Sequence, residues 1–195
     1  CAGFAILNKF SLADSLVVLA AASVGQFVRG RLNRRWLNQF GVAALASAAA
    51  CLVYLMLADL LTNTGLHTIH GPGYVASLLF LVPGFPMITS ILDMVRMDFT
   101  AGLSRAAYSF GLILAATMSA WMFSAATGLQ PLPAQTVFPY PWAWLAYAVA
   151  TACGVAGFAV IFNSPPRTVA WAAALGACGN LCRLALVGVN LPAQL

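Results

Sequence analysis

Long apolar runs, each about the length of a membrane span, alternate with short polar segments along this chain. A helix needs about 20 apolar residues to cross the hydrocarbon core of a bilayer. The pattern predicts about seven such elements, of which the first is only the end of a helix. They cover residues 1–7, 12–28, 40–61, 74–97, 101–127, 142–162 and 168–189. The expected fold class is therefore all-α, a polytopic helical membrane protein.

Composition supports this interpretation and excludes several functions. Of the 195 residues, 62% are hydrophobic and 7% are charged, whereas roughly a quarter of a soluble domain is charged. The net charge of +5 is not gathered into a basic patch with interleaved aromatic residues, so the expected partner is the lipid bilayer and not a nucleic acid. The five cysteines lie in apolar runs, which predicts neither disulfides nor a metal site. No nucleophile–base pair or nucleotide-binding loop is visible, so neither an enzyme nor a cofactor is expected.

The cationic residues indicate an orientation. If the basic loop at residues 29–35 faces the cytoplasm and every element crosses the membrane, seven of the nine cations lie on that side. These are Arg29, Arg31, Arg34, Arg35, Arg96, Arg105 and Arg167. This distribution agrees with the positive-inside rule and predicts a multi-pass protein of the inner or plasma membrane. A re-entrant fourth element would instead place Arg167 outside.

The fourth element, residues 74–97, is interrupted near its middle by Pro83-Gly84-Phe85-Pro86. Each proline removes a backbone donor and disfavours helix in the turn before it. Unpaired carbonyl groups cost several kcal/mol each in hydrocarbon, so a break is expected only where protein or a water-filled cavity meets it. Pro86 suits the first position of a new helical segment, where its missing donor costs nothing. The sequence therefore predicts a helix broken at residues 83–86.

The residues at and after this break are candidates for binding a substrate. The amides of residues 87–89 are expected to point into the break and, with the Thr89 and Ser90 hydroxyls, to hold a substrate carboxylate. The predicted substrate-binding residues are Pro83, Gly84, Phe85, Pro86, Thr89 and Ser90. The alternative interpretation is a proline kink packed against its neighbours.

Asp93 and Arg183 are the charges that most need an explanation inside predicted spans. Asp93 follows Pro86 by two helical turns on roughly the same face, which suits a proton carrier or an anchor for an ammonium group. Its alternative role is an ion pair with Arg96 near the cytoplasmic interface. Arg183 must pair, reach the interface or face a cavity. The loop histidines, His67 and His70, have no third ligand nearby and predict no metal site.

The chain also shows signs of an internal repeat. A shift of 154 residues aligns residues 2–5 with 156–159, Gly25 with Gly179 and Arg29 with Arg183. Five helices would separate the two copies, and an odd number inverts the second copy in the membrane. The predicted organisation has residues 1–127 as the end of a first five-helix repeat, 128–141 as an outer loop and 142–195 as the start of a second.

Residues around the break also resemble the threonine/serine exporter family. The motif is Val82-Pro83-Gly84-Phe85-Pro86, followed by Asp93, Asp98, Gly102 and Arg105. The turn at residues 162–167 and the glycine-containing helix at 176–183 are similar to the start of that family's second half. One departure is Met97, where the family usually has the glycine of a Gly-Asp pair.

The resemblance implies ten helices in two halves, an N-terminal soluble segment, and export of small amino acids driven by the proton gradient. The leading hypothesis is a secondary exporter of threonine or serine, in which the break binds substrate, Asp93 couples it to protons and Arg105 positions the inner end of the pathway. One alternative is a dicarboxylate exporter, as in the two-polypeptide branch of the family, with Arg105 and Arg183 binding the second carboxylate. Another is a non-transporting membrane scaffold or assembly subunit. A homo-oligomer or a partner subunit is compatible with each.

Overall fold

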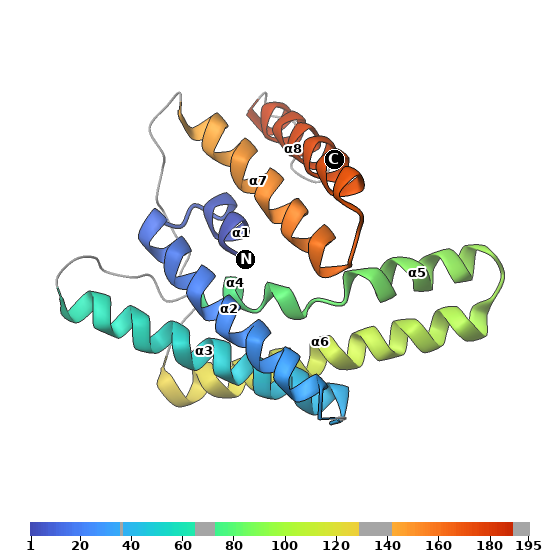
Figure 1. Ribbon diagram of the computed structural model, residues 1–195, viewed down its shortest axis with the longest axis horizontal. Helices are drawn as coiled ribbons and strands as arrows, with labels where there is room; N and C mark the ends of the chain where they lie inside the picture. Colours follow the sequence, from blue (N-terminus) through green and yellow to red (C-terminus); the bar gives the residue numbers. More distant parts are fainter. Residues whose placement is uncertain (36, 65–72, 129–141, 189–195) are drawn as a thin grey trace.

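The computed structural model describes residues 1–35, 37–64, 73–128 and 142–188, and this part of the chain is built from helices (Figure 1). They are α1 (Ala2–Leu7), α2 (Leu12–Asn33), α3 (Gln39–Asn63), α4 (Gly73–Ser77), the 3₁₀ turn η1 (Leu79–Leu81), α5 (Gly84–Val95), α6 (Phe99–Thr127), α7 (Trp142–Ile161) and α8 (Pro166–Gly188). Five helices in the described ranges are long and apolar enough to cross a membrane. The pair α4–η1 and α5 makes a sixth span if it is counted as one, bent by 57°. The predicted all-α membrane fold is confirmed.

Polar side chains fix where several of these helices begin. Ser11 and Asp14 form a reciprocal capping box at the start of α2, in which the Asp14 amide donates to Ser11 Oγ and the Ser11 amide donates to Asp14 Oδ2. Asp98 caps α6 by accepting a hydrogen bond from the Ala101 amide at 3.2 Å. α2 continues to Asn33, so the prediction that residues 29–33 are loop is wrong. Arginine is a good helix former and a single glycine is tolerated, so nothing in this segment ends the helix.

Small residues allow α2, α3 and α6 to pack closely. Alanines of α3 form much of the buried core between α2 and α6, among them Ala43, Ala46 and Ala50. Two hydrogen bonds cross between α3 and α6 in opposite directions: Ser47 Oγ donates to the Ala116 carbonyl at 3.0 Å, and Ser119 Oγ donates to the Ala44 carbonyl at 2.9 Å. Small residues and hydroxyl hydrogen bonds are the usual means of joining helices within a bilayer.

The broken element lies between two groups of helices. In Figure 1, α3 and α6 lie on one side of it, α1, α7 and α8 lie on the other, and α2 crosses it near α4. α7 packs on α8 and on α1. The α1–α7 crossing is close, because a Cβ atom on Gly3 would overlap the Ala150 carbonyl oxygen. α4 and η1 therefore run through the middle of the molecule, whereas α5 packs on α6 and buries Ser90.

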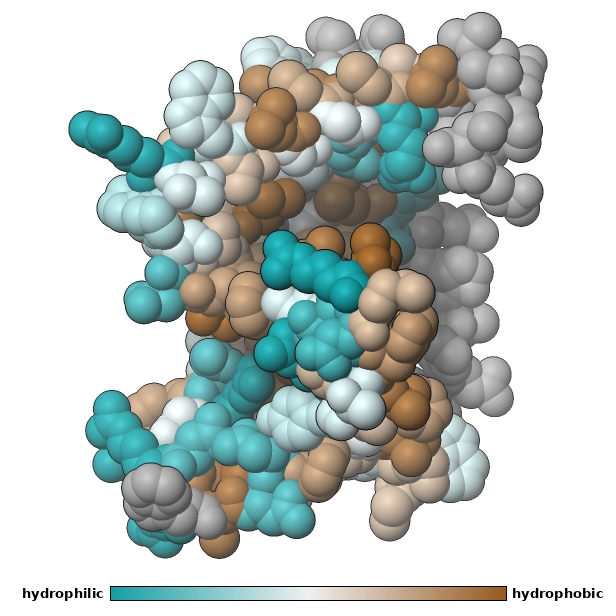
Figure 2. All heavy atoms as spheres, turned by 90° about the vertical axis from the view of Figure 1, so that its right-hand side faces the viewer, coloured by the Kyte–Doolittle hydropathy of each residue, from teal (hydrophilic) through white to brown (hydrophobic). Residues whose placement is uncertain are grey.

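The turns that carry most of the cations lie at one end of the molecule. Figure 1 shows the α2–α3, α5–α6 and α7–α8 turns on the same side. Figure 2 faces this end and shows hydrophilic side chains spread across it among apolar ones. The arginines exposed in or beside these turns are Arg31, Arg34, Arg35, Arg96 and Arg167. Their common location matches the arrangement expected if the fourth element crosses fully.

Candidate functional site at the helix break

The break itself is shorter than the sequence predicts. Val82 has an extended backbone, Pro83 caps α5, and α5 begins at Gly84. Pro86 is thus the third residue of α5 and not the first, which corrects the predicted start by two residues. The first amides of a helix have no intrahelical acceptor, so a proline at this position removes no hydrogen bond.

The predicted cradle of free amides is not formed at Met87. Its amide donates to the Pro83 carbonyl at 3.2 Å, inside the first turn of α5. The Gly84 amide, one of the first-turn donors, is also engaged, because it donates to the Val82 carbonyl at 2.9 Å. The start of α5 therefore offers a substrate fewer donors than expected.

The two hydroxyls predicted to bind substrate are also engaged with the backbone. Thr89 Oγ1 lies 3.0 Å from the Phe85 carbonyl and 3.1 Å from the Pro86 carbonyl. Ser90 Oγ donates to the Met87 carbonyl at 2.8 Å, and Ser90 is buried. Both oxygens keep acceptor lone pairs but have used their protons.

On the other side of the break, a freed carbonyl is met by an arginine of α2. Arg29 Nη1 donates to the Phe80 carbonyl at 2.9 Å, across 51 residues of sequence. Phe80 belongs to η1, and its ring is buried against Gly25 and Ala50. This contact confirms the expectation that protein meets the break. It also gives Arg29, which sequence analysis placed in a loop, a position within the bundle.

A cavity of about 390 Å³ opens at the break, between α2, α6 and α7. Small-molecule sites have volumes of roughly 300–1,000 Å³. Its lining residues are Gln26, Arg29, Gly30, Asn33, Phe80, Val82, Pro83, Phe85, Pro86, Tyr108, Leu112, Phe158, Ile161 and Phe162. Three of the six predicted substrate-binding residues line it, namely Pro83, Phe85 and Pro86.

The polar lining of this cavity comes chiefly from α2. Gln26, Arg29 and Asn33 are spaced three and four residues apart, so they lie on one face of the helix. Tyr108 contributes a phenol from α6. The polar stripe was visible in the sequence as a recurrence at helical spacing, but it was assigned to a span and a loop and therefore missed.

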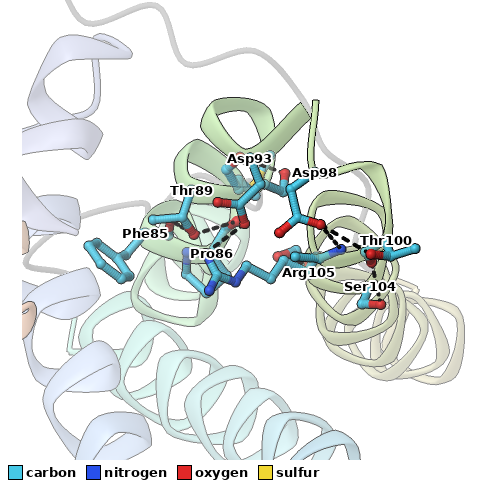
Figure 3. A network of polar contacts seen from close by, with 12 residues as sticks. Phe85, Pro86, Thr89, Asp93, Asp98, Thr100, Ser104 and Arg105 are labelled. Atoms are coloured by element: carbon cyan, nitrogen blue, oxygen red, sulfur yellow. Dashed lines mark hydrogen bonds and ion pairs between the residues drawn. The ribbon is translucent and has the colours of Figure 1, made fainter. Parts of the chain in front are cut away.

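A second polar cluster joins α5 to α6. Asp93 Oδ2 lies 2.7 Å from Arg105 Nη1; the Asp93 side chain is 21% exposed and that of Arg105 is 50% exposed. Figure 3 shows the Arg105 side chain reaching from α6 toward the Asp93 carboxylate on α5. The partner of Asp93 is thus Arg105 and not Arg96, which ends α5 with a non-helical backbone. Neither member of the pair lines the cavity.

Arg183 lies apart from both clusters. Its Nε donates to Asn180 Oδ1 at 3.3 Å on α8, which packs against α7, and it does not line the cavity. The described residues contain no group of three side chains able to hold a metal ion. His67 and His70 lie outside the described residues.

Comparison with known proteins identifies the family. A family model described as "Putative threonine/serine exporter" matches residues 1–127. The chain belongs to the threonine/serine exporter family. The match to this exporter family covers α1 to α6, and so includes the break, Arg29 and the Asp93–Arg105 pair. No solved structure matches the chain.

Two curated relatives of this exporter family are both named "Probable succinate transporter subunit YjjP". The protein from Escherichia coli K12 is 31% identical over 130 residues, which are 67% of this chain and 50% of the relative. That from Klebsiella aerogenes is 32% identical over 131 residues, 67% of this chain and 49% of the relative. The chain spans about half the length of the curated relatives it matches.

Proposed function

We propose that this chain is part of a secondary transporter that exports a small carboxylate across the inner or plasma membrane. The observation that carries the proposal is the cavity at the break, with the Arg29 cation on its wall. Interrupted helices that line a cavity within the bundle are the usual construction of substrate sites in secondary transporters. The cavity supports this role over that of a proline kink packed against its neighbours.

A small dicarboxylate such as succinate is the favoured substrate. Arg29 is the one charged residue among the described residues that line the cavity, so the site favours an anion. The relatives from E. coli and K. aerogenes carry succinate in their names. Threonine or serine is the second candidate, favoured by the description of the family. These zwitterions bring an ammonium group, for which the described lining offers no carboxylate.

Proton antiport through Asp93 is the proposed source of energy. The ion pair with Arg105 ties α5 to α6. Protonation of Asp93 would remove one charge of the pair and free Arg105 at the inner end of the pathway. Movement of α5 relative to α6 would then accompany each change in protonation, which is the coupling that an antiporter needs.

Three further features belong to the proposal, namely a partner subunit, an inverted repeat and an orientation in the membrane. The relatives are named as subunits, which supports a partner subunit as the source of further helices, with a homo-oligomer as the alternative. The 154-residue shift supports an inverted repeat whose second copy begins with α7 and α8. The exposed arginines at the end shown in Figure 2 support a cytoplasmic location for that end.

The test is efflux of preloaded, labelled succinate, threonine and serine from cells that express the full-length protein with its partner subunit. Measurements are made with and without a protonophore. Succinate efflux that the protonophore abolishes is the expected result. Efflux of threonine or serine alone would move the assignment to the second candidate. No efflux of any of the three, from protein shown to be in the membrane, would refute transport and favour the scaffold.

A further inference from the structure

We infer that Arg29 is the residue that binds the substrate carboxylate and selects anions over zwitterions, an inference that rests on the proposed function. The chain has only four acidic residues. Asp14 caps α2, Asp98 caps α6, and Asp93 pairs with Arg105. Asp59 lies in the last turns of α3, and none of the four lines the cavity. The charge of Arg29 therefore has no carboxylate partner among the described residues.

A half-buried cation without a counter-charge is costly inside a membrane protein, and such a residue usually faces a pathway or a ligand. The wall of a cavity of about 390 Å³ is such a place. A bound carboxylate would supply the missing negative charge. Because an ammonium group at the same position would be repelled, the arrangement discriminates by charge.

The Phe80 carbonyl prepares Arg29 for this role. A guanidinium has five N–H donors in a rigid plane, and the hydrogen bond from Nη1 to Phe80 uses one of them. That bond fixes the side chain near the break while other donors remain for a ligand. An arginine held in this way can bind a carboxylate with two parallel hydrogen bonds, which a lysine cannot.

The neighbouring polar groups extend the site to a second carboxylate. Asn33 lies one turn beyond Arg29 on α2, and Tyr108 lines the same cavity from α6. Their amide and hydroxyl are neutral donors, suited to the far end of a small dicarboxylate. Arg105 and Arg183 are not needed for this, because Arg105 is paired with Asp93 and Arg183 lies on α8.

The experiment measures succinate binding to the purified full-length protein by calorimetry, so that it does not depend on transport. Arg29→Gln should weaken binding by about 10- to 100-fold, the loss expected for one or two charge-assisted hydrogen bonds. Arg29→Lys should fall between this variant and the wild type. The control is Arg31→Gln, two residues on, whose side chain is exposed over the Phe27 ring and does not line the cavity. It should bind as the wild type does.

A second pair of variants keeps the test decisive if Arg29→Gln does not fold. Gln26→Glu adds a carboxylate one turn from Arg29 while keeping the Phe80 contact, and Gln26→Ala removes the amide without adding charge. Gln26→Glu should weaken succinate binding at least tenfold more than Gln26→Ala does. Equal affinity in these two variants, or wild-type affinity in folded Arg29→Gln, would overturn the inference. Failure of the proposed function looks different, since the wild type would then bind succinate through Arg29 without transporting it.

Discussion

Gly102 offers a sharp test of how α5 is held against α6. A Cβ atom at this position would lie 2.7 Å from Met94 Cγ, 2.9 Å from the Ser90 carbonyl oxygen and 3.2 Å from the Met94 amide nitrogen. The Met94 side chain can rotate away, but the other two atoms belong to the backbone of α5. Since ordinary contacts begin at 3.4 Å, Gly102→Ala must separate the two helices by about half an ångström.

The magnitude follows from two opposing terms. Overpacking of this kind costs about 1–3 kcal/mol, whereas alanine in place of glycine favours a helix by about 1 kcal/mol. Gly179→Ala in α8 is the matched control, because no atom lies within 4 Å of its added Cβ and only the helix-propensity gain applies. The difference in unfolding free energy between the two variants should therefore be about 1–3 kcal/mol, with Gly102→Ala the less stable.

The assay is equilibrium unfolding of the full-length protein by a denaturing detergent in mixed micelles, followed by helical circular dichroism. Because the Asp93–Arg105 ion pair spans the same two helices, Arg105→Gln should cost less in the Gly102→Ala background than in the wild type. Equal stability of Gly102→Ala and Gly179→Ala would refute close packing of α5 on α6 at Gly102.

Four further outcomes are expected. Met97 is 75% exposed and has a left-handed backbone with φ of 66°, so Met97→Gly should raise the unfolding free energy by about 0.5–1 kcal/mol in the same assay, whereas Met97→Ala should not. Ser11→Ala removes the capping hydrogen bond of α2 and should cost about 1 kcal/mol, with Ser11→Thr close to wild type. Ser47→Ala loses the bond to the Ala116 carbonyl and should cost about 0.6–1.7 kcal/mol, and a cost of zero would show that the α3–α6 hydrogen bond contributes nothing. Asp93→Asn should insert normally but lose protonophore-sensitive efflux; unchanged efflux would remove Asp93 from the coupling mechanism.

Much of the fold was predictable because a bilayer limits the choices. Only helices satisfy their own backbone in hydrocarbon, so apolar length translates directly into spans. The two prolines predicted the break because each lacks a backbone N–H donor, whatever the tertiary structure around it. The end of α2 was misplaced because the charge of Arg29 and Arg31 was taken as the edge of the membrane, while helix propensity continued through both residues.

The candidate site was harder to predict because its parts meet through tertiary packing. The sequence neighbour of Asp93 is Arg96, but the turn after α5 folds α6 back and brings Arg105 to the carboxylate instead. Arg29 and Phe80 are 51 residues apart, and no local rule relates them. The left-handed backbone at Met97 was not predicted either, although glycine, the residue that the family motif usually has at this position, adopts it most readily.

The long-range bond from Arg29 to Phe80 sets an order of events during biosynthesis. α2 leaves the ribosome before the broken element, and Arg29 has no backbone acceptor at the break until a further 51 residues have been made. At about 5–20 residues per second this interval lasts roughly 3–10 s. Until then the free energy of the guanidinium is lowest in the headgroup region of the bilayer. The contact that holds Arg29 at the break can therefore form only after the broken element has been made.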